Sequence, residues 1–395
     1  MIKRKAVVLG ANYYIGLSVI RCLGKEGVHV TAVDYDREKA YAFSSKYCSE
    51  IGIAPNYKSE SERFLKFLCD YADMQYEKPV LFPTADPYVA FMDENFDILK
   101  EKFVFPSDKK GLCSNLMDKN KLYKICEKYK VKYPETVYTD DENFFDKVEN
   151  LLKFPCMLKP ADSATFVHKF RQKMFLVKNK DELKEYLKKA DDANLTVFAQ
   201  RIIPGFDDHM YTYDAYLNQS GEVTHWTTCQ KYRQFPINFG ASVYTAQHYV
   251  KEIADIGRKF LQDVGFKGFA EIEFKKDAET GEFYLIEVNV RTTNFNTMLN
   301  KCGLNMPYIA YREMCSDPVE NFAVDYDTGI VFWCAYEDMF AVRDYIKKGQ
   351  LTRTDVFKSL FKKKAPAIWD IHDMKPFVKF SNQLVKKGIN KFTHR

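Results

Sequence analysis

Two neighbouring segments around residue 280 place acidic and amide side chains at strand-like spacing. They cover residues 268–277 and 282–291 with Thr280-Gly281 between them, which predicts a β-hairpin. Side chains alternate between the two faces of a strand. Those that share a face are Glu271 and Glu273 on the first strand and Glu287, Asn289 and Arg291 on the second. If the two faces coincide, their oxygen atoms suit Mg²⁺ bridging nucleotide phosphates; the alternative is a polar, solvent-facing side of a sheet.

Two lysines upstream stand where an anionic ligand would be needed. Lys159 ends an apolar strand and precedes a loop of small residues, 161–165, and a buried lysine requires an anionic partner. Lys119 stands at a predicted helix start, where the helix dipole also favours anions. Residues 198–205 predict a strand that leaves into a turn, with backbone groups that can bond the edge of an adenine.

The elements that position these residues begin with a β-α-β pattern. Strands are predicted at 5–10, 29–33 and 80–82, with a helix over 15–23 and a further strand at 104–106. Residues 1–107 therefore predict a small parallel α/β domain. Ligands of such sheets bind at the carboxyl ends of the strands, so Asn12 and Asp86 are candidate substrate contacts.

The segment Gly10 to Gly16 also resembles a dinucleotide-binding fingerprint, with Asp34 near the place of a ribose-binding acid. The fingerprint is incomplete, because Asn12 stands where a second glycine is needed and Ile15 stands where the third belongs. An NAD-dependent oxidoreductase is therefore kept as an alternative. The preferred interpretation is a sheet that binds no cofactor and whose loop contacts a substrate.

The pattern of apolar and polar residues changes twice in the middle of the chain. Residues 108–150 are mostly helical by spacing, and from residue 154 apolar runs broken by turns predict a mostly antiparallel sheet with few helices. The predicted strands are 156–159, 173–177, 196–203, 211–217, 223–229 and 242–246. Residues 251–264 predict an amphipathic helix.

In this order and spacing the segments resemble the ATP-grasp superfamily over about residues 5–330. The most specific element is the Glu-x-Asn-x-Arg strand, which is complete here as Glu287-Val-Asn289-Val-Arg291. The resemblance implies a mixed α/β and α+β protein, an ATP-grasp fold preceded by a Rossmann-like domain. The implied division is an N-terminal domain over 1–107, an ATP-grasp domain of two subdomains over 108–325, and a basic segment of one strand and helices over 326–395.

The resemblance also implies roles for individual residues. Lys119, Lys159 and the loop beginning at Ser163 would bind nucleotide phosphates. Gln200, Arg201 and Ile203 would hold the adenine, and Asp207 or Asp208 the ribose. Glu273, Glu287 and Asn289 would ligate Mg²⁺. Arg291 would stabilise an oxyanion, and Lys231 and Arg233 are candidates for a second phosphate or carboxylate contact, unless they form an exposed basic pair on a strand.

Within the superfamily the layout is most similar to carboxylate–amine ligases related to D-aspartate ligase, a group associated with bacterial cell-wall and capsule chemistry. The stretch 367–373, Ala-Ile-Trp-Asp-Ile-His-Asp, is also reminiscent of that group. The implied activity joins a small-molecule carboxylate to an amine through an acylphosphate, with ATP and Mg²⁺ as cofactors. A non-catalytic ATP-binding module is the other alternative. The oligomeric state and the two substrates are left open.

Composition limits where the protein works. The chain of 395 residues is 46% hydrophobic and 29% charged, its ten cysteines form no C-x-x-C pair, and it has no apolar stretch of membrane-spanning length, so we expect a cytoplasmic protein. Residues 343–395 hold 14 Lys and Arg against 4 Asp and Glu. With Phe357, Leu360, Phe361, Phe377 and Phe380 between the charges, this tail favours an anionic membrane surface or nucleic acid; the alternative is a solvated helical face.

Overall fold

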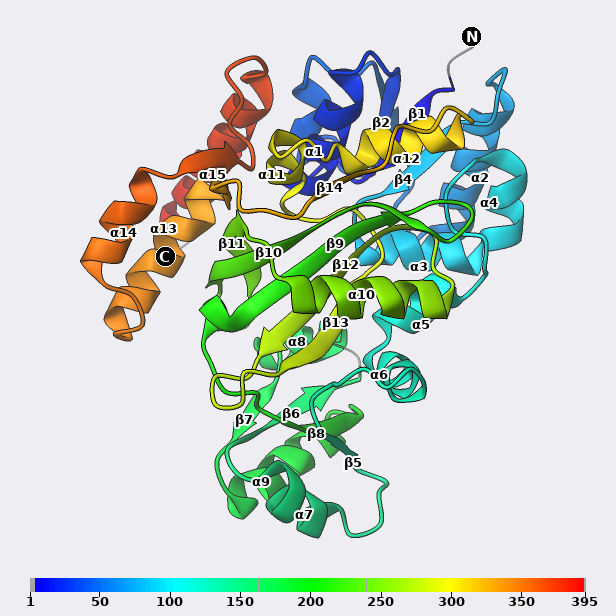
Figure 1. The fold of residues 1–395 in the computed structure, drawn as a ribbon. Coiled ribbons are helices and arrows are strands. Elements are labelled where there is room, and N and C mark those ends of the chain that lie inside the picture. The colour runs from blue at the N-terminus through cyan, green and yellow to red at the C-terminus, as the bar shows by residue number, and fades with distance from the viewer. Residues whose placement is uncertain (1–3, 162, 239, 394–395) are drawn as a thin grey trace.

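Three β-sheets follow one another from the top to the bottom of the molecule in the computed structural model (Figure 1). The structure describes residues 4–161, 163–238 and 240–393, excluding the side chains of residues 163, 164 and 387–393. The N-terminal sheet lies at the top, the largest sheet crosses the middle, and a small sheet lies at the bottom. The chain therefore has the mixed α/β architecture that its sequence predicts.

The N-terminal sheet is fully parallel, in the order β3-β2-β1-β4. Its strands are β1 (Ala6–Leu9), β2 (Val30–Asp34), β3 (Glu50–Ile53) and β4 (Val80–Pro83). Every residue of β1 is buried, because apolar layers cover both faces of the sheet. The helices of this part are α1 (Tyr14–Gly24), α2 (Ser61–Asp73), α3 (Asp86–Glu94) and α4 (Phe96–Lys102). The strand expected at 104–106 is reduced to a single bridge between Val104 and Val80.

The small sheet is antiparallel, in the order β5-β8-β6-β7. Its strands are β5 (Thr136–Tyr138), β6 (Cys156–Pro160), β7 (Phe175–Val177) and β8 (Val197–Arg201). The helices before and around it are α5 (Leu112–Met117), α6 (Lys119–Lys128), α7 (Phe144–Lys147), α8 (Ser163–Phe170) and α9 (Lys180–Asp191). The loop expected at 161–165 is thus shorter than predicted, since α8 begins within it, and α9 was not anticipated.

The large sheet has the order β13-β12-β9-β10-β11-β15-β16, and β14 pairs with β10. Its strands are β9 (Met210–Leu217), β10 (Val223–Phe235), β11 (Ala241–Gln247), β12 (Gly268–Lys276), β13 (Phe283–Asn289), β14 (Phe322–Val324), β15 (Ile330–Trp333) and β16 (Lys363–Pro366). The amphipathic helix α10 (Lys251–Val264) spans the residues that its spacing predicts, and it buries its apolar stripe on this sheet. Because β15 and β16 extend the same sheet, the strands run across the expected boundary at residue 325.

The remaining helices are α11 (Asn296–Lys301), α12 (Met306–Met314), α13 (Ala335–Lys347), α14 (Arg353–Leu360) and α15 (Lys375–Thr393). Helices α11 and α12 pack on α1, α13 packs on β10 and β11, and α15 packs on residues Tyr41–Ser44. Helices α13 and α14 form a lobe at the left of Figure 1. Within the described ranges, no helix combines the length and the apolarity needed to cross a bilayer.

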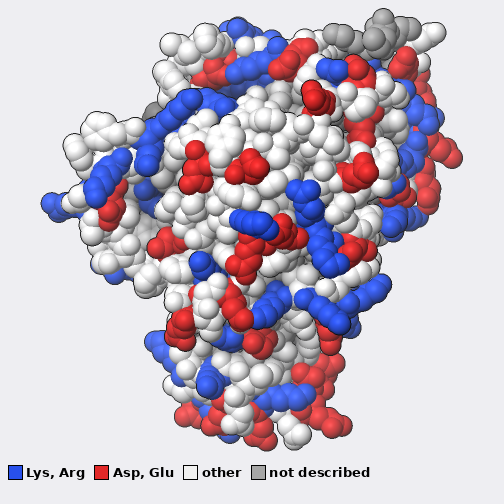
Figure 2. Space-filling model, viewed as in Figure 1, with Lys and Arg blue, Asp and Glu red and all other residues white. Residues whose placement is uncertain are grey.

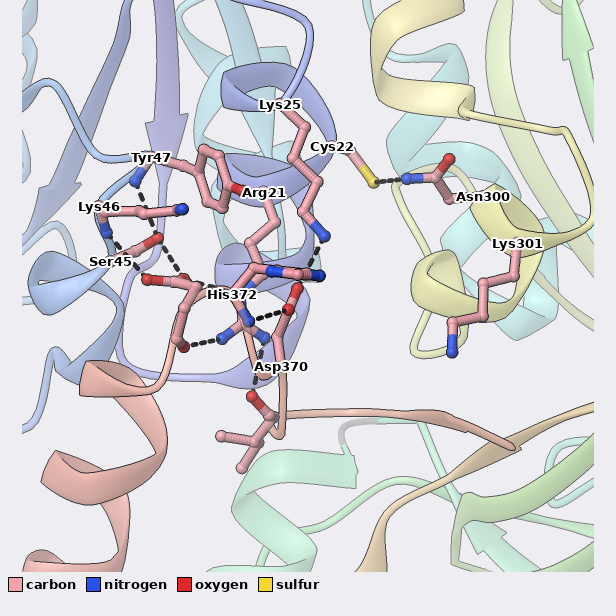
Figure 3. A network of polar contacts seen from close by, with 12 residues as sticks. Arg21, Cys22, Lys25, Ser45, Lys46, Tyr47, Asn300, Lys301, Asp370 and His372 are labelled. Atoms are coloured by element: carbon pink, nitrogen blue, oxygen red, sulfur yellow. Dashed lines mark hydrogen bonds and ion pairs between the residues drawn. The ribbon is translucent and has the colours of Figure 1, made fainter. Parts of the chain in front are cut away.

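A buried ion pair ties the C-terminal segment to the N-terminal sheet. Arg21 on α1 contacts Asp373 through Nε at 2.9 Å, and its two terminal nitrogens donate to the carbonyl oxygens of Ile368 and Asp373, each at 2.8 Å. Asp373 also accepts from the Ser45 hydroxyl at 2.6 Å and from the backbone N–H of Lys46 at 2.9 Å. Figure 3 shows the Arg21 guanidinium enclosed by these segments. The stretch 367–373 is therefore a structural strap.

We expect Asp373→Asn to lower the free energy of unfolding by about 3–5 kcal/mol, because it leaves the buried Arg21 charge uncompensated. The matched control is Asp370→Asn, three residues earlier, which breaks a more exposed pair with Lys25 and should cost at most about 1 kcal/mol. Urea unfolding followed by circular dichroism measures both. Equal losses in the two variants would contradict the role of Arg21–Asp373 as the anchor.

Candidate active site

One cavity of about 740 Å³ collects most of the residues that the sequence singles out. Its walls come from all three sheets. The predicted residues that line it are Asn12, Asp86, Lys119, Lys159, Gln200, Arg201, Ile203, Asp207, Lys231, Glu273, Glu287, Asn289 and Arg291. Asp208 and Arg233 are not among its lining residues, and Ser163 lies outside the described side chains.

The acidic wall is the β12–β13 hairpin, and the polar faces of its two strands coincide. Glu273 lies opposite Glu287 in the register, and Glu271 lies opposite Asn289. Because directly opposed residues of an antiparallel pair project from the same face, the carboxylates and the amide converge. The Asn289 amide donates to Glu271 at 3.0 Å, and the Thr293 hydroxyl also donates to Glu271.

Cations from other elements balance this acidic wall. Lys231 on β10 has a side chain that is only 5% exposed, and its ammonium lies 2.5 Å from Glu273. Although burial alone would lower the pKa of Lys231, Glu273 and Glu271 raise it, so this lysine is charged. Burial likewise acts to raise the pKa of Glu287, but Lys119 and Lys231 lower it to about 2.

Lys119 is the first residue of α6, and its side chain reaches Glu287 on the β12–β13 hairpin. The Asp118 side chain caps this helix by accepting from the backbone N–H groups of Asn120 and Lys121 at 2.9 and 3.1 Å. The Lys119 ammonium lies 3.6 Å from a carboxylate oxygen of Glu287. The start of α6 thus holds a cation next to the carboxylates of the acidic wall.

A second lysine lies on the floor of the small sheet. Lys159 on β6 is 8% exposed, and its ammonium donates to the Gln200 side-chain oxygen at 2.7 Å. The Gln200 amide in turn donates to the Thr136 hydroxyl at 2.9 Å, which fixes its orientation. Burial, assisted by Lys119, lowers the pKa of Lys159 to about 7. An anionic ligand in the cavity would stabilise its charged form.

The side chain of Arg201, which lines the cavity, is held by two acids. Its guanidinium contacts Glu135 at 3.3 Å and the buried Asp277 at 3.0 Å. The Gln200 side chain is bonded to Lys159. The segment 200–203 can therefore offer a ligand its backbone groups and its apolar side chains. Four apolar side chains line this end of the cavity: Met157, Leu176, Ile202 and Ile203. Sequence reasoning missed Met157 and Leu176, whose alternation along β6 and β7 was the available signal.

The acidic pair after this segment is also partnered. Asp207 is 2% exposed and accepts from the backbone N–H of Asn238 at 2.7 Å and from the Tyr345 hydroxyl. Asp208 points to His209 at 2.8 Å. Nearby, Lys275 lines the cavity and donates to the carbonyl oxygens of Gly205 and Phe206, at 2.7 and 2.5 Å. Burial lowers the pKa of Lys275 to about 8, and its spacing of two residues from Glu273 along β12 was the available signal for this residue.

Arg233 lies outside the cavity although Lys231 lies inside it. The ladder between β10 and β11 shifts register on both sides of Arg233, so simple alternation from Lys231 does not hold. Arg233 forms two bonds with Asp338 on α13, at 2.6 and 2.7 Å, and its guanidinium lies 3.8 Å from the Tyr244 ring centre. We therefore correct its expected role from a ligand contact to a structural ion pair.

The N-terminal sheet closes the far end of the cavity. Arg291, just after β13, contacts Asp86 at the start of α3 at 2.5 Å and donates to the Asn289 oxygen at 3.1 Å. This pair joins the acidic wall to the N-terminal sheet. Asn12 lies on the same side of the cavity.

The glycine segment of the N-terminal sheet packs against itself. A Cβ added to Gly16 would lie 1.8 Å from the carbonyl oxygen of Gly10, so this glycine permits close contact between helix and loop. Asp34 is 1% exposed and accepts from the backbone N–H of Ala11 at 2.7 Å. The acid that would bind a ribose in a dinucleotide site is thus committed to holding the loop, which disfavours the oxidoreductase alternative.

The chemistry of the donor set fits a hard cation. In the described part of the chain, no three His, Cys, Asp and Glu side chains lie together as a metal site. The set on the hairpin is instead two carboxylates, Glu273 and Glu287, with the Asn289 amide oxygen. The donor atoms of all three side chains are oxygens. Oxygen donors suit Mg²⁺ that is held by protein and phosphate groups together.

Two comparisons of sequence agree on one group of ligases. Residues 124–309 match the family described as D-ala D-ala ligase C-terminus. The D-aspartate ligase of Enterococcus faecium (strain Aus0004) is 26% identical over 246 residues, which cover 60% of this chain and 58% of the relative. The match thus spans less than two thirds of the length of that relative.

Solved structures share the fold at low sequence identity. The biotin carboxylase domain of Hydrogenobacter thermophilus 2-oxoglutarate carboxylase, in complex with MgADP, ADP and bicarbonate, superposes with a TM-score of 0.64 at 15% identity, covering 84% of this chain and 74% of that one. The N5-carboxyaminoimidazole synthetase of Staphylococcus aureus gives a TM-score of 0.61 at 14% identity, covering 82% and 80%. The chain is thus similar in sequence to D-aspartate ligase and to the D-ala D-ala ligase family, and it shares its fold with these solved enzymes.

Proposed function

We propose that this protein is an ATP- and Mg²⁺-dependent carboxylate–amine ligase that forms an amide bond through an acylphosphate, with an amino acid among its substrates. The observation that carries the proposal is the joining of the hairpin's oxygen donors, Lys119, Lys159 and Arg291 in one cavity. The sequence relationship to a D-aspartate ligase supports the substrate class. The incomplete and self-packed glycine loop argues against nicotinamide chemistry.

Nucleotide binding uses the two ends of the small sheet. The apolar end at Met157, Leu176 and Ile203 suits the adenine, with backbone groups of β8 available for its edge. Lys159 and Lys119 then lie where the phosphates extend toward the hairpin. Glu273, Glu287 and Asn289 would hold Mg²⁺, which when bound offsets charge on the phosphates.

In the first chemical step a carboxylate oxygen of the substrate bonds to the γ-phosphorus of ATP, and the bond to ADP breaks. Negative charge on the moving phosphoryl group is balanced by Lys159 and Lys231, which the fold holds in fixed positions. The carboxylate oxygen becomes part of the phosphate leaving group. Without this activation, the oxygen of a carboxylate does not leave when an amine attacks.

In the second step the substrate ammonium first loses a proton to water, and the neutral amine then attacks the carbonyl carbon of the acylphosphate; inorganic phosphate leaves and takes up the proton that the nitrogen gives up. Arg291 is positioned to stabilise the oxyanion of the tetrahedral intermediate. Asp86 and Asn12, which line the cavity on the side of the N-terminal sheet, would bind the amine-bearing substrate. A substrate ammonium at Asp86 would share that carboxylate with Arg291.

The direct test is ADP release from Mg-ATP with amino acids of both hands as carboxylate or amine donors. We expect release that depends on an amino acid, and a loss on the order of 100-fold or more in Glu287→Gln, because that change removes a fixed charge at the reacting phosphate. Glu282→Gln is the matched control on the same hairpin, since Glu282 is exposed and pairs with Lys132, and it should keep full activity. Equal rates in all three proteins would reject the proposed site.

The Lys231–Glu273 pair predicts a counterintuitive effect on metal binding. The ammonium of Lys231 competes with a cation for Glu273, so Lys231→Met should bind Mn²⁺ roughly tenfold more tightly without nucleotide while losing turnover. Water-proton relaxation measures Mn²⁺ binding. The matched control is Lys275→Met, because the Lys275 ammonium contacts carbonyl oxygens and not the acidic wall. Unchanged or weaker Mn²⁺ binding in Lys231→Met would contradict the competition.

A further inference from the structure

Helix α14 presents an apolar surface that the fold leaves uncovered. Phe357, Leu360 and Phe361 are 62%, 57% and 76% exposed, and the helix has no buried residue. Their spacing of three and four residues places them on one face. The rings of Phe357 and Phe361 lie 5.1 Å apart, so the three side chains form one cluster, here called the α14 tip.

The opposite side of α14 is the one attached to the protein. The Tyr244 hydroxyl on β11 donates to the carbonyl oxygen of Ser359 at 3.2 Å. Val356 and Ser359 are the half-covered positions of the helix, whereas Phe357 and Leu360 project outward. The tip is thus held in place by the sheet while its apolar face points to solvent.

Positive charge surrounds the α14 tip. Residues 343–363 contain seven exposed cations and two acids, a formal charge of +5. The cations are Arg343, Lys347, Lys348, Arg353, Lys358, Lys362 and Lys363. The two acids are engaged locally, Asp344 with Arg343 at 2.9 Å and Asp355 with the Thr352 cap. Figure 2 shows blue side chains around the lobe at the left of the view, over α13 and α14.

We infer that the α14 tip binds an anionic lipid bilayer, with Phe357, Leu360 and Phe361 entering the headgroup boundary and the surrounding cations contacting lipid phosphates. Each cation near such a surface adds to binding, and each large apolar side chain adds more. An apolar cluster with a basic rim fits both the apolar interior and the anionic headgroups of a bilayer. Nucleic acid would match only the positive charge of the rim. The inference concerns where the protein binds and is independent of the proposed reaction.

The remaining aromatic residues of the basic tail do not share this role. Phe377 packs against Trp369 at 5.0 Å, and Phe380 packs against Tyr41 at 5.3 Å. Several aromatic residues of the tail were candidates for a membrane contact. Phe357 and Phe361, at the end of α14, are therefore the ones that remain exposed together.

Flotation of the full chain with vesicles tests the inference. We expect binding to phosphatidylcholine vesicles that contain phosphatidylglycerol, little binding to phosphatidylcholine alone, and weakening by salt. Phe357→Ser with Phe361→Ser should reduce partitioning more than about tenfold, and Lys358→Glu with Lys362→Glu should do the same. Tyr326→Ser is the control, since Tyr326 is 58% exposed but lies outside the tip. All the replaced side chains are exposed, and thermal melting checks that each variant folds.

Three outcomes would overturn the inference. The first is absence of binding to anionic vesicles by the wild type. The second is binding that Phe357→Ser with Phe361→Ser leaves unchanged, which would assign it to charge alone. The third is a dimer, seen by sedimentation, that the phenylalanine variant dissociates while vesicle binding is absent, which would make the tip an interface between two copies.

Discussion

The arrangement of the site depends on one electrostatic constraint, the gathering of three carboxylates on one face of a β-hairpin. Glu271, Glu273 and Glu287 share that face because the β12–β13 register places opposed residues side by side. Like charges this close require compensation, and besides Arg291 on the hairpin itself it comes from lysines of other elements. Lys231 comes from β10 and Lys119 from the start of α6. The tertiary fold is therefore what stabilises this acidic surface.

The same constraint joins the parts of the chain to one another. Arg291 extends from the hairpin to Asp86 of the N-terminal sheet, and the charge of Glu287 on the hairpin acts on Lys159 of the small sheet. The strap at 367–373 holds α1 through the buried Arg21–Asp373 pair. Because candidate substrate contacts and candidate nucleotide contacts lie on different sheets, the strap helps to fix the distance between them.

Much of the site was predictable from the sequence because strand alternation is strictly local. The spacing of Glu287, Asn289 and Arg291 fixes their common face, and the Thr280-Gly281 turn indicates the hairpin that brings Glu273 alongside. Lys119 was predictable from its position at a helix start. The N-terminal parallel sheet and α10 followed from apolar periodicity.

The features that sequence reasoning missed depend on tertiary contacts. A register shift in β10 turns Arg233 toward Asp338, and alternation cannot anticipate a bulge. Gln200 and Arg201 are bound to other side chains, Lys159 and Asp277 among them, that lie far away in the sequence. The continuation of the large sheet into β15 and β16 was hidden for the same reason.

The proposed reaction activates a carboxylate by phosphorylation in the cavity. The most direct measurement uses a carboxylate substrate with heavy oxygen in its carboxyl group and follows the label by mass spectrometry of the released phosphate. We expect one labelled oxygen per turnover in inorganic phosphate, since that oxygen leaves with the phosphoryl group. Phosphate released without label, at the same rate as the amide forms, would contradict the acylphosphate.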